Sequence, residues 1–194
     1  MQPSEELVIR PLSADLLEDY LSFFDHDAFC DNPDWAACYC YFFHVARHDA
    51  AWEARSGEQN RAAISALIAG GRAHGYLAYV AGKPVGWCHA APRLEIPYLQ
   101  VVPELHVEDG QRVGAIVCFV IAAPFRRQGI ARNLLDAACE GFRQQGLAFA
   151  EAYPRLDTHA EDENYPGPLA LYSDAGFETF RQLDGALIVR KLLT

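Results

Sequence analysis

The sequence lacks any long hydrophobic run and any excess of positive charge. No apolar stretch approaches the length needed to span a bilayer, and no charged segment followed by an apolar one opens the chain. The 16 Lys and Arg are outnumbered by 26 Asp and Glu, which gives a formal net charge of −10. Such a charge disfavours contact with nucleic-acid phosphates and with anionic membrane surfaces. We therefore expect a cytoplasmic protein that binds neither nucleic acid nor membrane.

Internal repeats, low-complexity tracts and linker-like segments are also absent from the 194 residues. A domain usually takes roughly 100–200 residues, so this length suits one domain. Hydrophobic residues make up 51% of the chain, which is ample for a buried core. We predict a single domain over residues 1–194.

Six cysteines are present without a secretory signal, so we expect reduced thiols rather than disulfides. Cys88, Cys118 and Cys139 lie in apolar surroundings and are expected to be small core residues. A second group has the residue types of metal ligands, and its members are Cys30, Cys38, Cys40, His44 and His48. Its spacing departs from the usual zinc patterns, so aromatic packing is the favoured explanation and no metal is expected.

The stretch from Val113 to Gly146 organises the chain. An apolar run ending at Ile121 is followed by a basic, glycine-containing turn and then by an amphipathic pattern typical of a helix. The first backbone N–H groups of a helix have no intrahelical partners and carry partial positive charge, so such a turn attracts phosphate. Gly129 lets the main chain approach a ligand closely. Both Gly-x-Gly-x-x-Gly and Gly-Lys-Ser/Thr are absent, which excludes the dinucleotide-fold and Walker motifs.

The rest of the chain predicts a mixed α/β sheet with helices on its faces. Residues 25–56 have no clean period and are expected to form an irregular lobe over the site, and residues 92–112 a long insertion that could act as a lid. The other expected elements are strands at 7–12, 76–81, 85–91, 147–153, 177–183 and 186–192, and helices beginning at Ser13, Glu58 and Gly167.

Two motifs carry a resemblance to a known family. Arg126-Arg127-Gln128-Gly129-Ile130-Ala131 follows a strand, and Leu171-Tyr172-Ser173-Asp174-Ala175-Gly176-Phe177 comes some forty residues later. In both motifs and in the order of its elements, the sequence resembles the GNAT superfamily of acyl-CoA-dependent N-acetyltransferases. The resemblance implies a mixed, mostly antiparallel sheet of about seven strands flanked by helices. It also implies an acyl-CoA cleft where the strand ending near Ile121 splays from the strand at 149–153.

The resemblance implies how acyl-CoA is held. Main-chain groups of Phe119, Val120 and Ile121 would pair with the pantetheine arm like an added strand. The turn would hold the pyrophosphate, and its residues are Arg126, Arg127, Gln128, Gly129, Ile130, Ala131 and Arg132.

Three side chains are candidates for acid–base catalysis. The resemblance implies that Tyr172 is the general acid that protonates the leaving thiolate; otherwise it packs its helix on the sheet. Glu151 is the first candidate for the base, although it could instead pair with a substrate ammonium or an arginine. His89 is the second candidate and could equally be structural. Water remains a further alternative.

The expected function is transfer of an acetyl group from acetyl-CoA directly to a primary amine, through a ternary complex. The acceptor could be a small molecule or a protein. The alternative is a non-catalytic acyl-CoA-binding regulatory or interaction protein. Acidic residues at 157 and 161–163 favour a cationic acceptor, although they could be solvated surface charge. The last hairpin could present an edge for a homodimer.

Overall fold

The computed structural model describes residues 6–46, 50–156 and 164–194. Within this part of the chain, seven strands form one sheet in the order β1-β2-β3-β4-β5-β7-β6. Only β4 and β5 are parallel, and every other neighbouring pair is antiparallel. The strands are β1 (Leu7–Pro11), β2 (Tyr76–Val80), β3 (Lys83–Pro92), β4 (Val113–Ile121), β5 (Phe149–Ala152), β6 (Glu178–Leu183) and β7 (Ala186–Leu192). The predicted mixed, mostly antiparallel sheet is confirmed.

The helices are α1 (Leu17–His26), α2 (Ala50–Glu53), α3 (Gly57–Ala69), α4 (Pro97–Val101), α5 (Ile130–Gln144) and α6 (Leu169–Ser173). Two short 3₁₀ helices, Pro33–Cys38 and Phe42–His44, lie in the irregular lobe expected at residues 25–56. Ser56 caps α3 in a capping box with Gln59, which explains where that helix begins. None of these helices is long and apolar enough to cross a membrane, as judged from the described residues.

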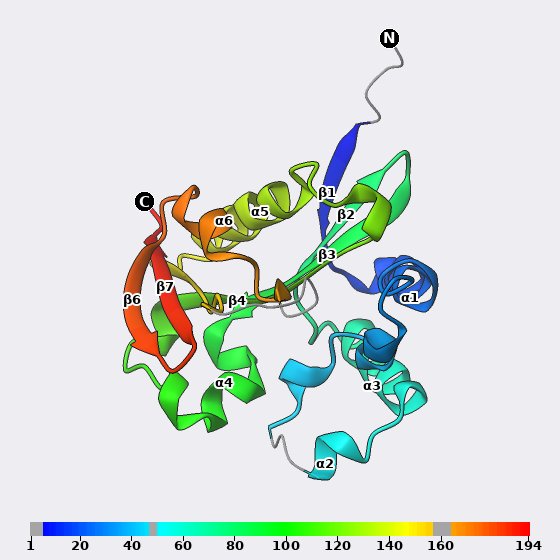
Figure 1. Ribbon diagram of the computed structural model, residues 1–194, viewed down its shortest axis with the longest axis horizontal. Coiled ribbons are helices and arrows are strands. Elements are labelled where there is room, and N and C mark those ends of the chain that lie inside the picture. Colours follow the sequence, from blue (N-terminus) through cyan, green and yellow to red (C-terminus); the bar gives the residue numbers. More distant parts are fainter. Residues whose placement is uncertain (1–5, 47–49, 157–163) are drawn as a thin grey trace.

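The sheet has a hydrophobic core on each face. The helix α5 packs Leu134, Leu135 and Phe142 against one face, together with α6. The helices α1 and α3 and the irregular lobe cover the other face, where Tyr20 and Ile64 are buried (Figure 1). The apolar stripe expected on α5 therefore faces the sheet as its spacing indicates.

The strands β4 and β5 separate along their length. Their parallel pairing runs only from Val113 with Phe149 to Ile116 with Ala152. The strand β4 then continues to Ile121 beside β3, whereas β5 has ended. The second half of β4 thus has no β5 neighbour, and the predicted splay between these strands is present.

Residues 92–112 differ from the expected lid. They form short helical turns that bury Ile96, Leu99 and Leu105 in the core. The buried Arg93 donates to the carbonyl oxygens of Leu99 and Leu105, which ties the segment to itself. Apolar residues at 96, 99 and 105 explain the difference, because burying them stabilises the folded segment.

Glycine at position 114 allows α5 to approach β4 closely. An ideal Cβ there would lie 2.3 Å from the Phe142 ring. We expect Gly114→Ala to lower the free energy of unfolding by about 3 kcal/mol through overpacking, measured by urea denaturation. Gly71→Ala is the comparison, because it has φ +65 and nothing within 4 Å, and should cost only about 1 kcal/mol. Equal losses in the two variants would contradict the close packing.

Candidate functional site

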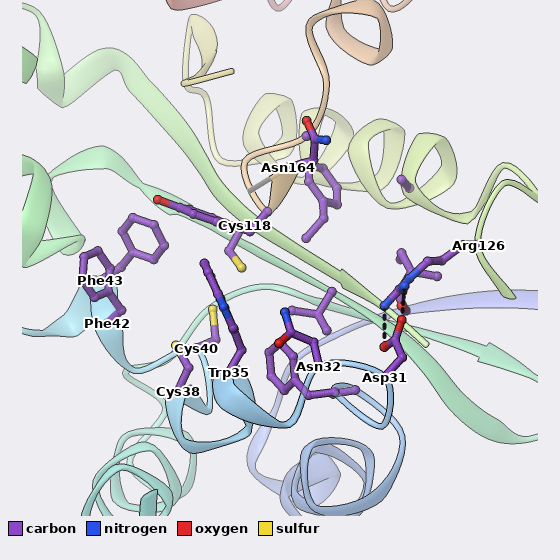
Figure 2. A pocket seen from close by; sticks show the side chains of 18 of the residues that line it. Asp31, Asn32, Trp35, Cys38, Cys40, Phe42, Phe43, Cys118, Arg126 and Asn164 are labelled. Carbon is purple, nitrogen blue, oxygen red and sulfur yellow. Dashed lines mark hydrogen bonds and ion pairs between the residues drawn. The ribbon is translucent and has the colours of Figure 1, made fainter. Parts of the chain in front are cut away.

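A pocket of about 1310 Å³ opens beside the second half of β4. Its walls come from four segments: the irregular lobe, the unpaired part of β4, the turn leading into α5, and residues 164–171. Figure 2 shows Cys38, Cys40 and Trp35 of the lobe facing Cys118 of β4. The pocket is large compared with a typical small-molecule site of about 300–1000 Å³, so it has room for more than one ligand.

The turn after β4 presents backbone amides to this pocket. Gly129 has φ +82, a left-handed conformation that favours glycine, and it directly precedes α5. The first intrahelical bond runs from the Asn133 amide to the Gly129 carbonyl, at 3.1 Å. The amides of Ile130, Ala131 and Arg132 therefore lack helical acceptors, and all three residues line the pocket. This arrangement suits an anionic group such as a phosphate.

The basic side chains of the turn have different partners. Arg126 donates to the Ile121 carbonyl at 3.0 Å and to Asp31 at 3.0 Å, which joins the turn to the lobe (Figure 2). The hydrogen bond from Arg126 lowers the pKa of Asp31. Arg132 pairs with Asp136 at 3.0 Å. Arg127 also lines the pocket, whereas Gln128 donates to the Pro124 carbonyl and lies outside the lining.

The open edge of β4 is covered at one point by the segment before α6. The Phe119 amide donates to the Tyr165 carbonyl at 2.6 Å. The Tyr165 ring lies 5.6 Å from the ring of Trp35 in the lobe, and the Arg155 guanidinium lies 5.3 Å from its centre. Phe119, Val120 and Ile121 all line the pocket. A ligand that pairs with Phe119 has to replace the Tyr165 carbonyl.

Tyr172 lies behind the pocket wall. Its side chain is fully buried, its hydroxyl donates to the Pro166 carbonyl, and its ring packs 5.3 Å from that of Phe177. Burial raises the pKa of Tyr172 well above its usual value, so the phenol stays protonated. Tyr172 is not among the lining residues, although Leu171 is. Its role as general acid stays a prediction and requires the hydroxyl to leave Pro166.

Glu151 is enclosed between two arginines. One carboxylate oxygen accepts from Arg93 at 3.1 Å and from Tyr153, and the other accepts from Arg190 at 2.7 Å. Arg190 also pairs with Asp109 at 2.9 Å. The carboxylate is buried and lies outside the pocket lining. The structure therefore shows the alternative in which Glu151 pairs with arginine, and the base role has no geometric support.

His89 lies beneath the pocket, next to a cysteine that lines it. Its Nδ1 atom is 3.5 Å from the Cys40 sulfur, and its ring stacks on His44 with centroids 4.9 Å apart. Its Nε2 atom is buried and has no hydrogen-bond partner within the described ranges. Cys118, its cross-strand partner on β4, also lines the pocket.

The cysteines and histidines that have the residue types of metal ligands differ in their surroundings. Cys30 is exposed, whereas Cys38 and Cys40 line the pocket. Residues 6–46, 50–156 and 164–194 contain no group of three or more His, Cys, Asp or Glu arranged to hold a metal ion. His48 and the acidic residues at 157 and 161–163 lie outside the described residues.

The sequence did not identify the lobe side chains that form the wall opposite the turn. These are Trp35, Phe42, Trp52, Glu53, Arg55 and Asn60. Asn60 is buried and donates to the Ala37 carbonyl at 2.9 Å, while Arg55 donates to Asn60 at 2.6 Å. The sequence feature that could have indicated this wall is the cluster of aromatic residues around Cys38-Tyr39-Cys40. Their irregular spacing fits neither a helix nor a strand, so it did not show which of them face a pocket.

The family of the chain follows from a comparison with protein-family models. The model described as Acetyltransferase (GNAT) family matches residues 35–177, which include the turn, β4 and α6. The chain belongs to this family. No curated protein shows a significant match in sequence.

Solved structures of GNAT proteins share the fold at low identity. A putative acetyltransferase of the GNAT family from Desulfovibrio desulfuricans is 14% identical with TM-score 0.60, covering 97% of this chain and 100% of that one. PaiA N-acetyltransferase from Thermoplasma acidophilum, solved with coenzyme A, is 12% identical with TM-score 0.54, covering 96% and 99%. The ribosomal-protein-S18-alanine N-acetyltransferase of Escherichia coli is 15% identical with TM-score 0.53, covering 97% and 95%.

Removing the Glu151 charge should destabilise the fold rather than act on the pocket. We expect Glu151→Gln to lower the free energy of unfolding by about 3 kcal/mol, because it leaves Arg93 and Arg190 buried without their shared anion. Urea denaturation measures this loss. Glu140→Gln removes an exposed pair with Arg143 and should change stability little. A fully stable Glu151→Gln protein with lost activity would instead restore the catalytic assignment.

Proposed function

We propose that this GNAT protein transfers an acetyl group from acetyl-CoA to a primary amine. The observation that supports this proposal is the arrangement of three neighbouring features in one pocket. They are the edge of β4 that does not pair with β5, the glycine turn that follows it, and the first amides of α5. This combination suits a ligand that has an extended amide-containing arm and a phosphate group. Acyl-CoA has both, and it supplies an activated thioester.

The residues fit acyl-CoA without special side chains. Main-chain groups from Phe119 to Ile121 would pair with the pantetheine arm, once the Tyr165 carbonyl is displaced. The amides from Gly129 to Arg132 would hold the pyrophosphate, with Arg127 adding charge. Coenzyme A in the related Thermoplasma structure supports this assignment.

The acceptor would lie on the lobe side of the pocket. Trp35, Phe42 and Trp52 offer aromatic faces, and Asp34 and Glu53 offer negative charge. Aromatic faces and carboxylates together attract a protonated amine. The similar Escherichia coli enzyme is named for an alanine of a ribosomal protein, which supports a protein amine as the acceptor. The size of the pocket also suits a small molecule. Both classes of acceptor therefore remain in the proposal.

Direct transfer in a ternary complex stays a prediction, and a general-acid role for Tyr172 in it would require the hydroxyl to leave Pro166. A cytoplasmic location also stays a proposal, and it agrees with the net charge and the reduced thiols. A homodimer through β6 is a further proposal, supported by the position of β6 at the end of the sheet and by the exposed Phe180.

The glycine turn provides the first test. We expect Gly129→Ala to raise the Kd for coenzyme A about 10-fold, a loss of about 1.4 kcal/mol, because a Cβ strains the left-handed turn and displaces the phosphate-binding amides. Isothermal titration calorimetry measures the affinity. Gly71→Ala is the matched control, since it strains a similar left-handed backbone at a residue outside the pocket lining. Equal affinity in both variants would place the phosphate elsewhere.

A panel of amines provides the test of activity. With acetyl-CoA present, we expect thiol release that depends on the amine and an acetylated product identified by mass spectrometry. The panel should include small polyamines, amino acids, aromatic amines and peptides with free N-termini. Coenzyme A binding without any product across the panel would favour the non-catalytic regulator instead.

A further inference from the structure

Arg155 lines the pocket directly after β5, and its side chain is exposed. Its guanidinium carbon lies 5.3 Å from the centre of the Tyr165 ring, and its Nη2 atom lies 3.4 Å from the Tyr165 hydroxyl. Within the described ranges Arg155 forms no ion pair with a carboxylate. The pocket therefore contains a guanidinium whose charge is not neutralised by an acid of the described chain.

The register of the sheet places Arg155 at the acyl end of the proposed donor site. Ala152 of β5 pairs with Ile116 of β4, and the two strands run parallel. Arg155 and Phe119 each follow that pair by the same number of residues, on segments that have separated. Tyr165 connects the two sides, because its carbonyl accepts from the Phe119 amide and its ring contacts Arg155. The phosphate-binding amides follow the far end of β4, so Arg155 lies beside the reacting end of a donor bound along this edge.

The backbone around Arg155 is fixed to the last hairpin. Arg155 forms an isolated bridge with Ala186, the first residue of β7. The Pro154 carbonyl and the Leu156 amide each form a main-chain hydrogen bond of 2.9 Å with the same hairpin. None of these contacts involves Tyr165, so they persist when an acyl donor replaces the Tyr165 carbonyl at β4.

The lobe supplies aromatic surface near Arg155. The Tyr165 ring lies 5.6 Å from that of Trp35 and 6.2 Å from that of Phe43. Phe42 extends this surface, since its ring packs 5.2 Å from that of Phe43. All four of these aromatic residues line the pocket. A ligand with an apolar body and an anionic group matches this combination of aromatic rings and guanidinium.

Three other arginines of the lining already have polar partners. Arg55 donates to Asn60 at 2.6 Å on the lobe, and Arg126 and Arg132 form ion pairs with aspartates. Arg155 differs from them, because its contacts within the described residues are with one tyrosine. Its N–H groups are therefore available to a ligand in the pocket.

We propose that Arg155 binds a carboxylate of the acceptor, so that the acceptor is a small molecule that carries both an amine and a carboxylate, as amino acids do. This inference rests on the proposed function, because it names the acceptor of that reaction. A planar guanidinium binds a carboxylate through two parallel hydrogen bonds, which fixes the molecule and leaves its amine free to reach the acyl carbon. Asp34 and Glu53 of the lobe lining complement the ammonium end of such a zwitterion.

The central experiment compares acceptors that differ in the carboxylate alone. Phenylalanine is paired with phenethylamine, leucine with isopentylamine, and aminohexanoate with hexylamine. Thiol release from acetyl-CoA gives kcat/KM for each compound in the wild-type protein and in Arg155→Gln. With every carboxylate-bearing acceptor that the wild type acetylates, we expect the variant to lose about 30-fold in kcat/KM, mainly through KM. The matched amines should change by less than about 3-fold. Each acceptor is compared with itself in two proteins, so differences in amine basicity cancel.

Two further variants test whether the effect belongs to the guanidinium of Arg155. Arg155→Lys keeps the charge without the planar fork, so we expect it to recover part of the activity that Arg155→Gln loses. Arg112→Gln is the matched control, because Arg112 is also exposed and lies 5.6 Å from the centre of an aromatic ring, that of Phe149, but is outside the pocket lining. It should leave kcat/KM unchanged for every acceptor. Urea unfolding curves show that each variant is folded under the assay conditions.

The outcomes separate this inference from the proposed function. Equal activity of Arg155→Gln and wild type with carboxylate-bearing acceptors, or acetylation only of amines that lack a carboxylate, overturns the inference and leaves the acetyltransferase intact. Binding of coenzyme A without acetylation of any compound overturns both. We expect Arg155→Gln to keep the Kd for coenzyme A in calorimetry. A Kd that rises for coenzyme A but not for dephospho-coenzyme A would place Arg155 on the donor and overturn its role towards the acceptor.

Discussion

A β-bulge at Val117 is the constraint on which the site depends. His89 pairs with Cys118 while the next residue, Ala90, pairs with Ile116, so Val117 is an extra residue in β4. A bulge bends its strand and increases the local twist. This one falls directly after Ile116, the last residue of β4 that pairs with β5. The bend accounts for the end of the parallel pairing and for the open edge that lines the pocket.

Buried ion pairs fix the half of β5 that stays paired. Glu151 pairs in register with Ala115 of β4, and its carboxylate binds Arg93 and Arg190. Arg93 begins the segment between β3 and β4, and Arg190 lies on β7, so one carboxylate joins three parts of the chain around the branch point. Breaking such a buried pair is costly. The separation of the strands is therefore confined to the half of β4 beyond the bulge.

The sequence predicted the parts of the molecule that depend on local pattern. The apolar run of β4, the amphipathic α5 and the turn at Gly129 each have a local physical signature, and they were placed correctly. The bulge has none, because Val117 is as apolar as its neighbours. The partners of Glu151 could not be predicted either, since Arg93 and Arg190 are distant along the chain and only the tertiary fold brings them together.

The same bulge affects how β4 meets the lobe. Without an extra residue, Val117 and Cys118 would point to opposite faces of β4. With it, both belong to the core on the lobe side, where Cys40 and His89 lie. One irregularity thus ends the pairing of β4 with β5 and turns Cys118 to the face that the lobe covers. A strand of regular pleat would place only one of these two side chains on that face, so the bulge decides which side chains of β4 meet the lobe.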